Sequence, residues 1–190
     1  MQIQKVIFLD TETTGVDFVN DEIIQCAAIL VDLDTKEVEG SINYFFEATK
    51  DIPPRITEIN GYYRGKWEEE GYYPIDRNTG AEYIYKFVKQ PNTAIFCHNS
   101  AFDRSFVAAF LTRFGGYDAL DLPKYWFDNA TLAVLFVMKS DWETITLDFC
   151  KTKLGVEYQR LKKHDALDDC YLLKEVFFEF MKRIHVDRVA

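Results

Sequence analysis

Lys5-Val6-Ile7-Phe8-Leu9-Asp10 is a short, continuously apolar run that ends in an acid, and Thr11-Glu12-Thr13-Thr14-Gly15 follows it. Such a run predicts a central strand that is buried on both faces of a sheet. Asp10 and Glu12 are two residues apart, so both side chains are expected on the same face where this strand ends. Taken alone, Asp-x-Glu at the end of a strand is more often simply an exposed turn.

Strands and helices alternate along the rest of the chain. We expect four further strands, at residues 22–32, 38–48, 93–98 and 125–128, and helices at residues 79–89, 100–114, 131–138, 146–154 and 166–184. Pro53-Pro54 breaks the chain, and an irregular aromatic segment occupies residues 61–76. Three meandering strands followed by alternating helices and strands predict an α/β domain with a mixed five-stranded sheet. The length of 190 residues fits one domain, residues 1–190.

The composition argues against several classes of protein. With 48% hydrophobic residues the chain is not expected to be disordered, and it has neither an apolar run of membrane-spanning length nor a signal-peptide pattern at its start. Its four cysteines are widely spaced, which favours reduced, mostly buried thiols in a cytoplasmic protein. The net charge of −9 counts against tight, extended binding of nucleic acid. An enzyme that grips only a few terminal nucleotides would need fewer phosphate contacts.

A third acid lies in His98-Asn99-Ser100-Ala101-Phe102-Asp103, at the start of a predicted helix. Counting in threes and fours, Asp103 shares a helix face with Phe106 and Phe110, so we expect it to point inward while Arg104 points outward. The alternative is an acid that is favourable near a helix N-terminus. That alternative does not explain the inward direction.

The last predicted helix carries a fourth acid. Asp169 falls on its apolar stripe, whereas Asp168 falls with Glu175 and Glu179 on the polar face. Asp165 and Asp168 are interpreted as solvated acids of the first turn, with Asp165 as a candidate N-cap. Asp169 needs a buried partner, and a metal ion would supply one. The stripe consists of Ala166, Cys170, Leu173, Phe177, Phe180 and Ile184.

His164 lies just before this helix. A single histidine is usually a surface residue, but five residues ahead of a candidate metal ligand the general-base interpretation is the better one. All four acids stand at the ends of apolar elements, where an unpaired charge is costly. A divalent metal site would explain them together. Hard oxygen ligands favour Mg²⁺ or Mn²⁺, and such ions commonly serve phosphoryl chemistry, so the sequence predicts a nuclease.

Together these segments resemble the DnaQ-like, or DEDDh, family of 3'-5' exonucleases, which adopt a ribonuclease H-like fold. Asp10-Thr11-Glu12 matches the first family motif, His98 to Asp103 matches the second, and His164-x-Ala166-x-x-Asp169 matches the third. The motifs come in the order of the family, and the resemblance covers nearly the whole chain. Local likeness to exodeoxyribonuclease X-like members is weaker. The chain departs from the family at Asn60-Gly61-Tyr62, where many members carry His-Gly-Ile.

The resemblance implies hydrolysis of the terminal phosphodiester with two metal ions, Mg²⁺ or Mn²⁺, and release of nucleoside 5'-monophosphates. Asp10 would bridge the ions, Glu12 and Asp169 would complete the site of one, and Asp103 would support the other. His164 would deprotonate the attacking water. The residues implied near the last nucleotides are Thr11, Thr13, Ile59, Asn60, Tyr62, His98 and Asn99.

Two features outside the motifs have competing interpretations. Most rings of the aromatic segment are expected to pack onto the sheet, with Tyr62 as the best candidate for stacking on a base. A basic stretch leads into His164, and it either steers phosphates toward the site or is merely solvated. It consists of Lys151, Lys153, Arg160, Lys162 and Lys163.

The favoured substrate is therefore a single-stranded 3' end, with DNA slightly preferred over RNA. Three alternatives stay open: an exoribonuclease that trims RNA ends, a non-catalytic polymerase-accessory or nucleic-acid-binding subunit, and, more distantly, an RNase H-type endonuclease. No membrane partner is expected. A homodimer or a polymerase partner is not readable from the sequence, although a free-standing enzyme is favoured.

Overall fold

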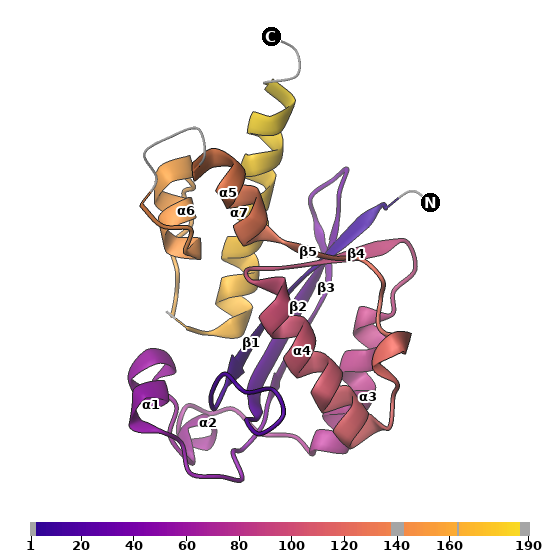
Figure 1. Cartoon of the computed structure of the whole chain (residues 1–190), viewed down its shortest axis with the longest axis vertical. Coiled ribbons are helices and arrows are strands. Elements are labelled where there is room, and N and C mark those ends of the chain that lie inside the picture. Colours follow the sequence, from indigo (N-terminus) through magenta and orange to yellow (C-terminus); the bar gives the residue numbers. More distant parts are fainter. Residues whose placement is uncertain (1–2, 138–142, 163, 187–190) are drawn as a thin grey trace.

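The five strands form one mixed sheet in the order β3-β2-β1-β4-β5. This is a computed structural model that describes residues 3–137, 143–162 and 164–186. The first three strands are antiparallel neighbours, and β4 and β5 continue the sheet in parallel with β1. Figure 1 shows the sheet in the middle of the molecule with helices on both of its faces. The strands are β1 (Lys5–Thr13), β2 (Ile23–Asp32), β3 (Val38–Phe45), β4 (Thr93–Cys97) and β5 (Trp126–Asp128).

Helices occupy three regions of the chain. The first group follows β3, the second follows β4, and the third follows β5. The helix α4 passes at its C-terminal end into a π-helical turn, Leu111–Gly115, and Ala119–Asp121 forms a short 3-10 helix. The α-helices are α1 (Pro54–Asn60), α2 (Lys66–Glu69), α3 (Arg77–Val88), α4 (Ser100–Phe110), α5 (Asn129–Val137), α6 (Leu147–Leu154) and α7 (Ala166–Val186).

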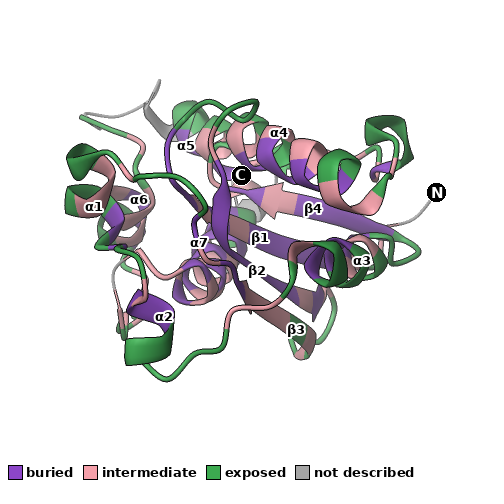
Figure 2. Cartoon of the chain, turned by 90° about the horizontal axis from the view of Figure 1, so that it is seen from below, coloured by how far each residue is buried: buried purple, intermediate pink, exposed green. Residues whose placement is uncertain are grey.

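Alternation along β1 divides the interior into two main cores. Ile7 and Leu9 pack with α3 and α4 on one face of the sheet, whereas Val6 and Phe8 pack with α7 on the other. A third cluster lies between α6 and α7, and a fourth holds the rings near α2. Figure 2 shows β1 and β2 buried almost throughout and the outer sides of the helices exposed.

The four cysteines are all free thiols, and all of them are buried. Cys26 and Cys97 belong to the core beneath α4, Cys170 to the core beneath α7, and Cys150 to the cluster between α6 and α7. The expectation of reduced, buried cysteines agrees with this arrangement. Within the described ranges, no helix combines the length and the apolar character needed to cross a membrane.

The mixed five-stranded sheet is confirmed, and the differences from prediction concern boundaries and short helices. The strand β1 continues through Thr13 because β2 pairs with it along its whole length. Pro53-Pro54 does not only break the chain: proline suits the first turn of a helix, and α1 begins at Pro54. The aromatic segment contains the single-turn helix α2. The last predicted residue of the helix at 131–138 lies outside the described residues.

Candidate active site

Asp10 and Glu12 lie on β1, on the face of the sheet that packs against α7. Val6 and Phe8 belong to the core beneath α7, and alternation along the strand carries the same face on to the two acids. The parallel partner β4 pairs with β1 only as far as Phe8, whereas β2 pairs with it up to Thr13. Among the described strands, this part of β1 therefore has a hydrogen-bonded neighbour on one side alone.

Asp103 lies in the first turn of α4 and is only 2% exposed, so the inward direction predicted for it agrees with the structure. The Thr11 hydroxyl donates a hydrogen bond of 2.9 Å to Asp103 Oδ1. Thr11 is itself buried, and its side chain orients the carboxylate from the neighbouring strand. The structure therefore gives the Thr11 hydroxyl a role in positioning Asp103.

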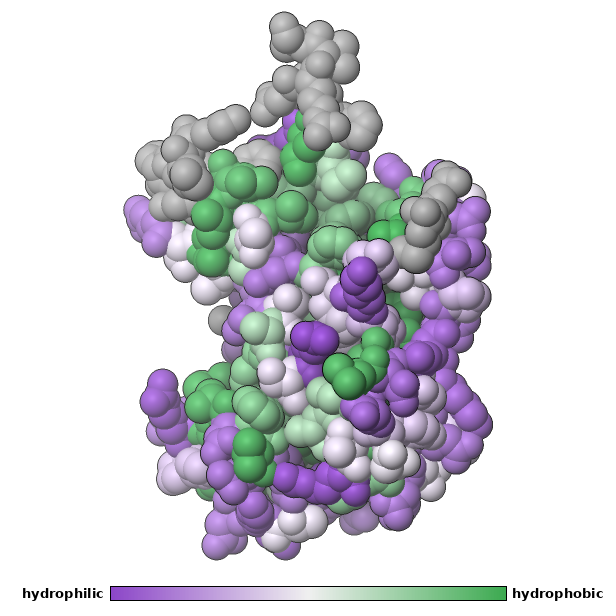
Figure 3. All heavy atoms as spheres, turned by 45° about the vertical axis from the view of Figure 1, so that its right-hand side comes forward, coloured by the Kyte–Doolittle hydropathy of each residue, from purple (hydrophilic) through white to green (hydrophobic). Residues whose placement is uncertain are grey.

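Asp169 and His164 complete the cluster from the start of α7. One carboxylate oxygen of Glu12, one of Asp169 and one ring nitrogen of His164 all lie within 4.8 Å of one another. Figure 1 shows the end of β1 and the starts of α4 and α7 converging in the middle of the molecule. The three sequence motifs therefore meet at one place. In Figure 3 the surface is hollowed between the part that carries α1 and α2 and the part that carries α5 and α6.

Burial raises the pKa values of all four carboxyl groups, and repulsion by neighbouring acids adds to the effect. Burial raises the pKa of Asp10 well above its ordinary value, and the charges of Asp103, Asp169 and Glu12 raise it further. Burial, followed by the charge of Asp169, raises the pKa of Glu12 to about 8. Burial raises the pKa of Asp103 and that of Asp169 to about 7. Four acids so placed are costly to ionise together without a cation.

The donor set fits a hard divalent cation. Among the described residues only Glu12, His164 and Asp169 form a candidate metal-binding group by proximity. Two of its three donors are carboxylate oxygens, which Mg²⁺ and Mn²⁺ prefer. Asp10 and Asp103 belong to the same electrostatic cluster, because the charges of Asp103, Asp169 and Glu12 raise the pKa of Asp10 and the charge of Asp103 also raises that of Glu12. No cysteine belongs to this group, which argues against a thiolate site.

Arg160 supplies positive charge inside the cluster. Its guanidinium forms one ion pair with Asp169 and another with Asp148 of α6, the latter with Nη1 3.2 Å from Oδ2. The side chains of Arg160 and Asp169 are 13% and 12% exposed, so this pair is largely shielded from water. Lys162 pairs with Glu70, beside α2. Arg160 and Lys162 are therefore held by acids, which weakens the interpretation that these two are freely solvated, while Lys163 lies outside the described residues.

The residues implied near the terminal nucleotide differ in accessibility. Ile59 is 49% exposed, whereas Asn60 is buried and its Nδ2 donates to the Thr13 carbonyl at 3.1 Å. A hydrogen bond from the Asn60 side chain also lowers the pKa of Glu12, against the larger effect of burial. The Thr13 hydroxyl donates to the Gly15 carbonyl at 2.6 Å. Asn60 thus links α1 to the end of β1.

The expectation that Tyr62 stacks on a base is corrected. Its ring is 0% exposed and packs 5.2 Å from the ring of Trp67, and its hydroxyl accepts a hydrogen bond from the Ala48 amide. Tyr62 follows the C-terminal glycine of α1, which turns the ring into the cluster beneath α2. The interpretation that most rings pack onto the sheet agrees with this, since Tyr72 also stacks on Phe45.

His98 and Asn99 border a separate hollow of about 400 Å³ beside β5 and the start of α6. The His98 Nδ1 atom lies 3.2 Å from Asn129 Nδ2, and burial lowers the pKa of the imidazole. Asn99 is exposed, and its backbone amide donates to Asp128 at 2.9 Å. The left-handed conformation of Asn99, with φ of 78°, directs the chain from β4 into α4.

Residues 7–177 match the family model described as Exonuclease, RNase_T. The chain belongs to this exonuclease family. The resemblance to DnaQ-like enzymes is thereby confirmed, while the exodeoxyribonuclease X-like subgroup stays a prediction.

Curated relatives of this exonuclease chain include both polymerases and ribonucleases. A PolC-type DNA polymerase III from Thermotoga petrophila is 28% identical over 97% of this chain and 12% of its own length. Ribonuclease T from Vibrio parahaemolyticus is 26% identical over 90% of this chain and 82% of its own length. The chain therefore spans about an eighth of the polymerase and most of the ribonuclease.

The solved structure of an exonuclease I has the same fold, with a TM-score of 0.80, 18% sequence identity and coverage of 95% of this chain and 41% of that one. The E. coli exonuclease I in complex with a dT13 oligonucleotide gives a TM-score of 0.77 at 18% identity, covering 98% of this chain and 42% of that one. The ribonuclease H-like architecture predicted for the exonuclease chain is thereby confirmed.

Sequence reasoning missed two residues beside the exonuclease motifs. Gln25 is fully buried in β2 opposite Glu12, and its side chain joins Asn43 of β3 at 3.0 Å to the Ala166 amide at 3.2 Å. A glutamine within the otherwise apolar run IIQCAAIL was the available signal. Lys66 is also buried, and its ammonium donates to the Asn60 carbonyl at 3.2 Å. No residue spacing in the aromatic segment indicated that Lys66 would be buried.

Asp168 is a second correction. The helical pattern placed it on the solvated face of α7, but it is 7% exposed because residues 158–162 fold over it. Asp165, by contrast, accepts hydrogen bonds from the Leu167 and Asp168 amides, as expected of an N-cap.

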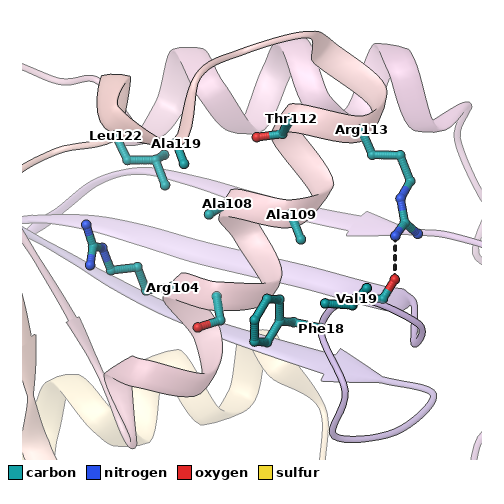
Figure 4. Close-up of a pocket in the computed structure, with 10 residues that line it drawn as sticks. Phe18, Val19, Arg104, Ala108, Ala109, Thr112, Arg113, Ala119 and Leu122 are labelled. Atoms are coloured by element: carbon teal, nitrogen blue, oxygen red, sulfur yellow. Dashed lines mark hydrogen bonds between the residues drawn. The ribbon is translucent and has the colours of Figure 1, made fainter.

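A groove of about 530 Å³ lies on the outer face of α4. Figure 4 shows Phe18 and Val19 on one side of it, Leu122 on the other, and Arg104 at one end. The outward direction predicted for Arg104 agrees with this view. None of the five candidate catalytic residues lines the groove, so it is separate from the acidic cluster.

Replacing Arg160 by glutamine is expected to destabilise the metal-free protein at pH 8 by on the order of 2 kcal/mol, because a buried carboxylate would lose its charged partner. The loss should shrink toward pH 5, where the carboxyl groups with pKa values near 7 are protonated in the folded protein. Urea unfolding in EDTA at both pH values measures it. An equal loss at both would contradict an electrostatic role.

Proposed function

We propose that this chain is a metal-dependent 3'-5' exonuclease that hydrolyses the terminal phosphodiester of single-stranded nucleic acid, with DNA favoured. The observation that supports it most is the convergence of four repelling carboxyl groups with His164 at the ends of three elements. We infer that the 190 residues form one exonuclease domain. The buried free thiols suit a cytoplasmic location.

Asp10, Glu12, Asp103 and Asp169 would hold two ions, which we propose to be Mg²⁺ or Mn²⁺. When bound, these ions would stabilise the negative charge that develops on the phosphate and on the leaving oxygen. Thr11 keeps Asp103 in place through its hydroxyl. The ring of His164 lies near the carboxyl groups of Glu12 and Asp169, with one ligand atom of each residue within 4.8 Å of the others.

His164 would act as the general base. A neutral imidazole near pH 7 can accept a proton from a water molecule, and the resulting hydroxide attacks the terminal phosphorus. The bond from phosphorus to the 3'-oxygen of the preceding nucleotide breaks, and that oxygen takes a proton from solvent. The products are a nucleoside 5'-monophosphate and a strand that is one residue shorter.

Ile59 and Asn99 are exposed members of the group implied near the last nucleotide. Ile59 lies beside Asn60, whose side chain donates to the end of β1. We propose that Ile59 contacts the terminal base, while His98 and Asn99 lie along the strand. The Thr11 and Thr13 side chains are turned inward, so any substrate contact of theirs would be made by the backbone.

Trimming of RNA ends is the second candidate, because ribonuclease T and an oligoribonuclease from Mycobacterium ulcerans are among the relatives. The crystal complex of exonuclease I with dT13 supports single-stranded DNA. The PolC-type relatives support a polymerase partner as an alternative to a free-standing enzyme or a homodimer. A role in DNA repair would follow from the DNA substrate.

Digestion of matched 5'-labelled single-stranded DNA and RNA oligomers tests the function. With Mg²⁺ or Mn²⁺ we expect a ladder that shortens from the 3' end, faster for DNA. Asp103→Asn should reduce the rate about a hundred-fold, since it keeps an oxygen for Thr11 but loses the charge. Absence of cleavage by folded wild-type protein would favour the non-catalytic accessory subunit, and internal cleavage would favour an endonuclease.

A further inference from the structure

The carboxylate of Asp168 binds the segment that leads into His164. Its Oδ1 accepts a hydrogen bond of 2.6 Å from the Tyr158 hydroxyl. Its Oδ2 accepts two more, from the backbone amides of Leu161 at 2.9 Å and Lys162 at 3.1 Å. Hydrogen bonds to a carboxylate are stronger than those between neutral groups. One buried side chain thus fixes three donors within a short stretch of chain.

Asp168 is not used to cap its own helix. Asp165 already accepts from the Leu167 and Asp168 amides at the start of α7, each at 3.1 Å. An acid in the first helical turn would ordinarily be explained by the helix dipole, which also acts on acids exposed to solvent and so does not require burial. Asp168 is instead buried beneath residues 158–162, and all three of its hydrogen bonds come from donors in that segment.

The same segment is held at two further points. Arg160 forms ion pairs with Asp169 and Asp148, and Lys162 pairs with Glu70. In these ion pairs the side chains of the segment contact neighbouring elements, whereas Asp168 binds the backbone of the segment directly. The backbone is therefore fixed at Leu161 and Lys162, two residues before His164.

His164 has a left-handed backbone conformation, with φ of 55°. Such a conformation is unfavourable for a residue other than glycine and persists only where the surroundings impose it. The fixed amides of Leu161 and Lys162 precede His164, and the N-cap Asp165 follows it. The unusual conformation therefore lies between two anchored points, and it presents the ring to Glu12 and Asp169.

We propose that Asp168 is a positioning residue of the reaction, which holds the 158–162 segment so that His164 faces the carboxylate cluster. This inference rests on the proposed role of His164 as general base. Asp168 would touch neither the substrate nor the ions. Its removal should slow the proton transfer while leaving binding of the strand almost unchanged.

A double-mutant cycle tests the proposal with Asp168→Ala, His164→Ala and the double variant, assayed on a 5'-labelled single-stranded DNA oligomer with Mn²⁺. We expect Asp168→Ala to lower kcat about 10- to 100-fold, a size typical of groups that orient a catalytic residue, with KM changed less than about three-fold. On the His164→Ala background the same change should have almost no further effect. Multiplicative losses would overturn the proposal.

Asp168→Asn gives a graded control, because an amide oxygen can still accept from Leu161 and Lys162. It should retain more activity than Asp168→Ala. Glu157→Gln changes an exposed acid beside Tyr158 and should behave as wild type. Equal losses for the asparagine and alanine variants would contradict anchoring through the two amides.

Hydrogen–deuterium exchange of the metal-free protein provides a readout that is independent of activity. In Asp168→Ala the Leu161 and Lys162 amides should exchange at least about ten-fold faster, while the strands of the sheet stay protected. Unchanged exchange would overturn the anchoring. If His164→Ala matched wild type in turnover, the proposed base would fail instead, and the exchange result would still decide whether Asp168 holds the segment.

Discussion

Asp10→Asn is expected to abolish hydrolysis, with a loss of at least about a thousand-fold in kcat, because several kcal/mol of charge stabilisation depend on the ions that this side chain would bridge. Digestion of 5'-labelled single-stranded DNA with Mg²⁺ or Mn²⁺ measures the loss. Asp34→Asn removes an equal charge from an exposed turn and should leave the rate unchanged. Turnover near the wild-type level in Asp10→Asn would remove Asp10 from the site.

The same substitution should stabilise the protein when no metal is present. The folded protein holds the Asp10 proton more tightly than the unfolded chain, since burial and three neighbouring acids raise its pKa well above 3.8. The free energy of unfolding of the wild type therefore falls as the pH rises above 3.8 and the unfolded chain ionises. The amide that replaces the carboxyl group carries no such cost, so the variant should be more stable than the wild type at pH 8.

Urea unfolding in EDTA at pH 5 and pH 8 measures this gain, which should be larger at pH 8. Below the ordinary carboxyl pKa both states are protonated, so the difference should vanish there. A variant less stable than wild type at pH 8 would mean that Asp10 is paired favourably without a metal. Loss of activity combined with gain of stability is the pattern expected of a residue retained for function.

His164→Ala is expected to lower kcat about a hundred- to ten-thousand-fold, the usual contribution of a general base. The side chain lies within 4.8 Å of Glu12 and Asp169 but is proposed to accept a proton, so Mn²⁺ binding should weaken far less than turnover. Single-turnover kinetics and calorimetric titration with Mn²⁺ separate the two effects. Strong loss of Mn²⁺ affinity with little loss of turnover at saturating metal would make His164 a ligand.

The parts of the fold that sequence predicted are those with a strong local pattern. The apolar run before Asp10 and the inward faces of α4 and α7 carry their own periodicity. The end of β1 does not, because Thr11 to Thr13 are polar and become strand only through pairing with β2. Proline likewise suggested a break at Pro54, although it also suits a helix start.

The candidate catalytic residues could be predicted because each belongs to a sequence motif. The residues that hold them in place could not be predicted. Asp168 was assigned to solvent by helical periodicity, which describes a face and says nothing of the segment that folds over it. Arg160 reaches Asp169 across a loop of no regular pattern. Tyr62 was the candidate for stacking on a base, and only the packing beneath α2 reveals its burial. All three cases depend on contacts between segments that are distant in the sequence, and local patterns do not show such contacts.

The four buried thiols make the chain a reporter of its own breathing motions. Burial raises the pKa of each thiol, so little of the reactive thiolate forms near neutral pH while the fold is closed. The rate at which a thiol reagent labels each cysteine therefore measures how often the structure around that cysteine opens. The labelling rate of Cys150 would report how often α6 separates from α7, and that of Cys26 how often the central sheet opens. The difference between their labelling rates would separate local from global unfolding without any engineered probe.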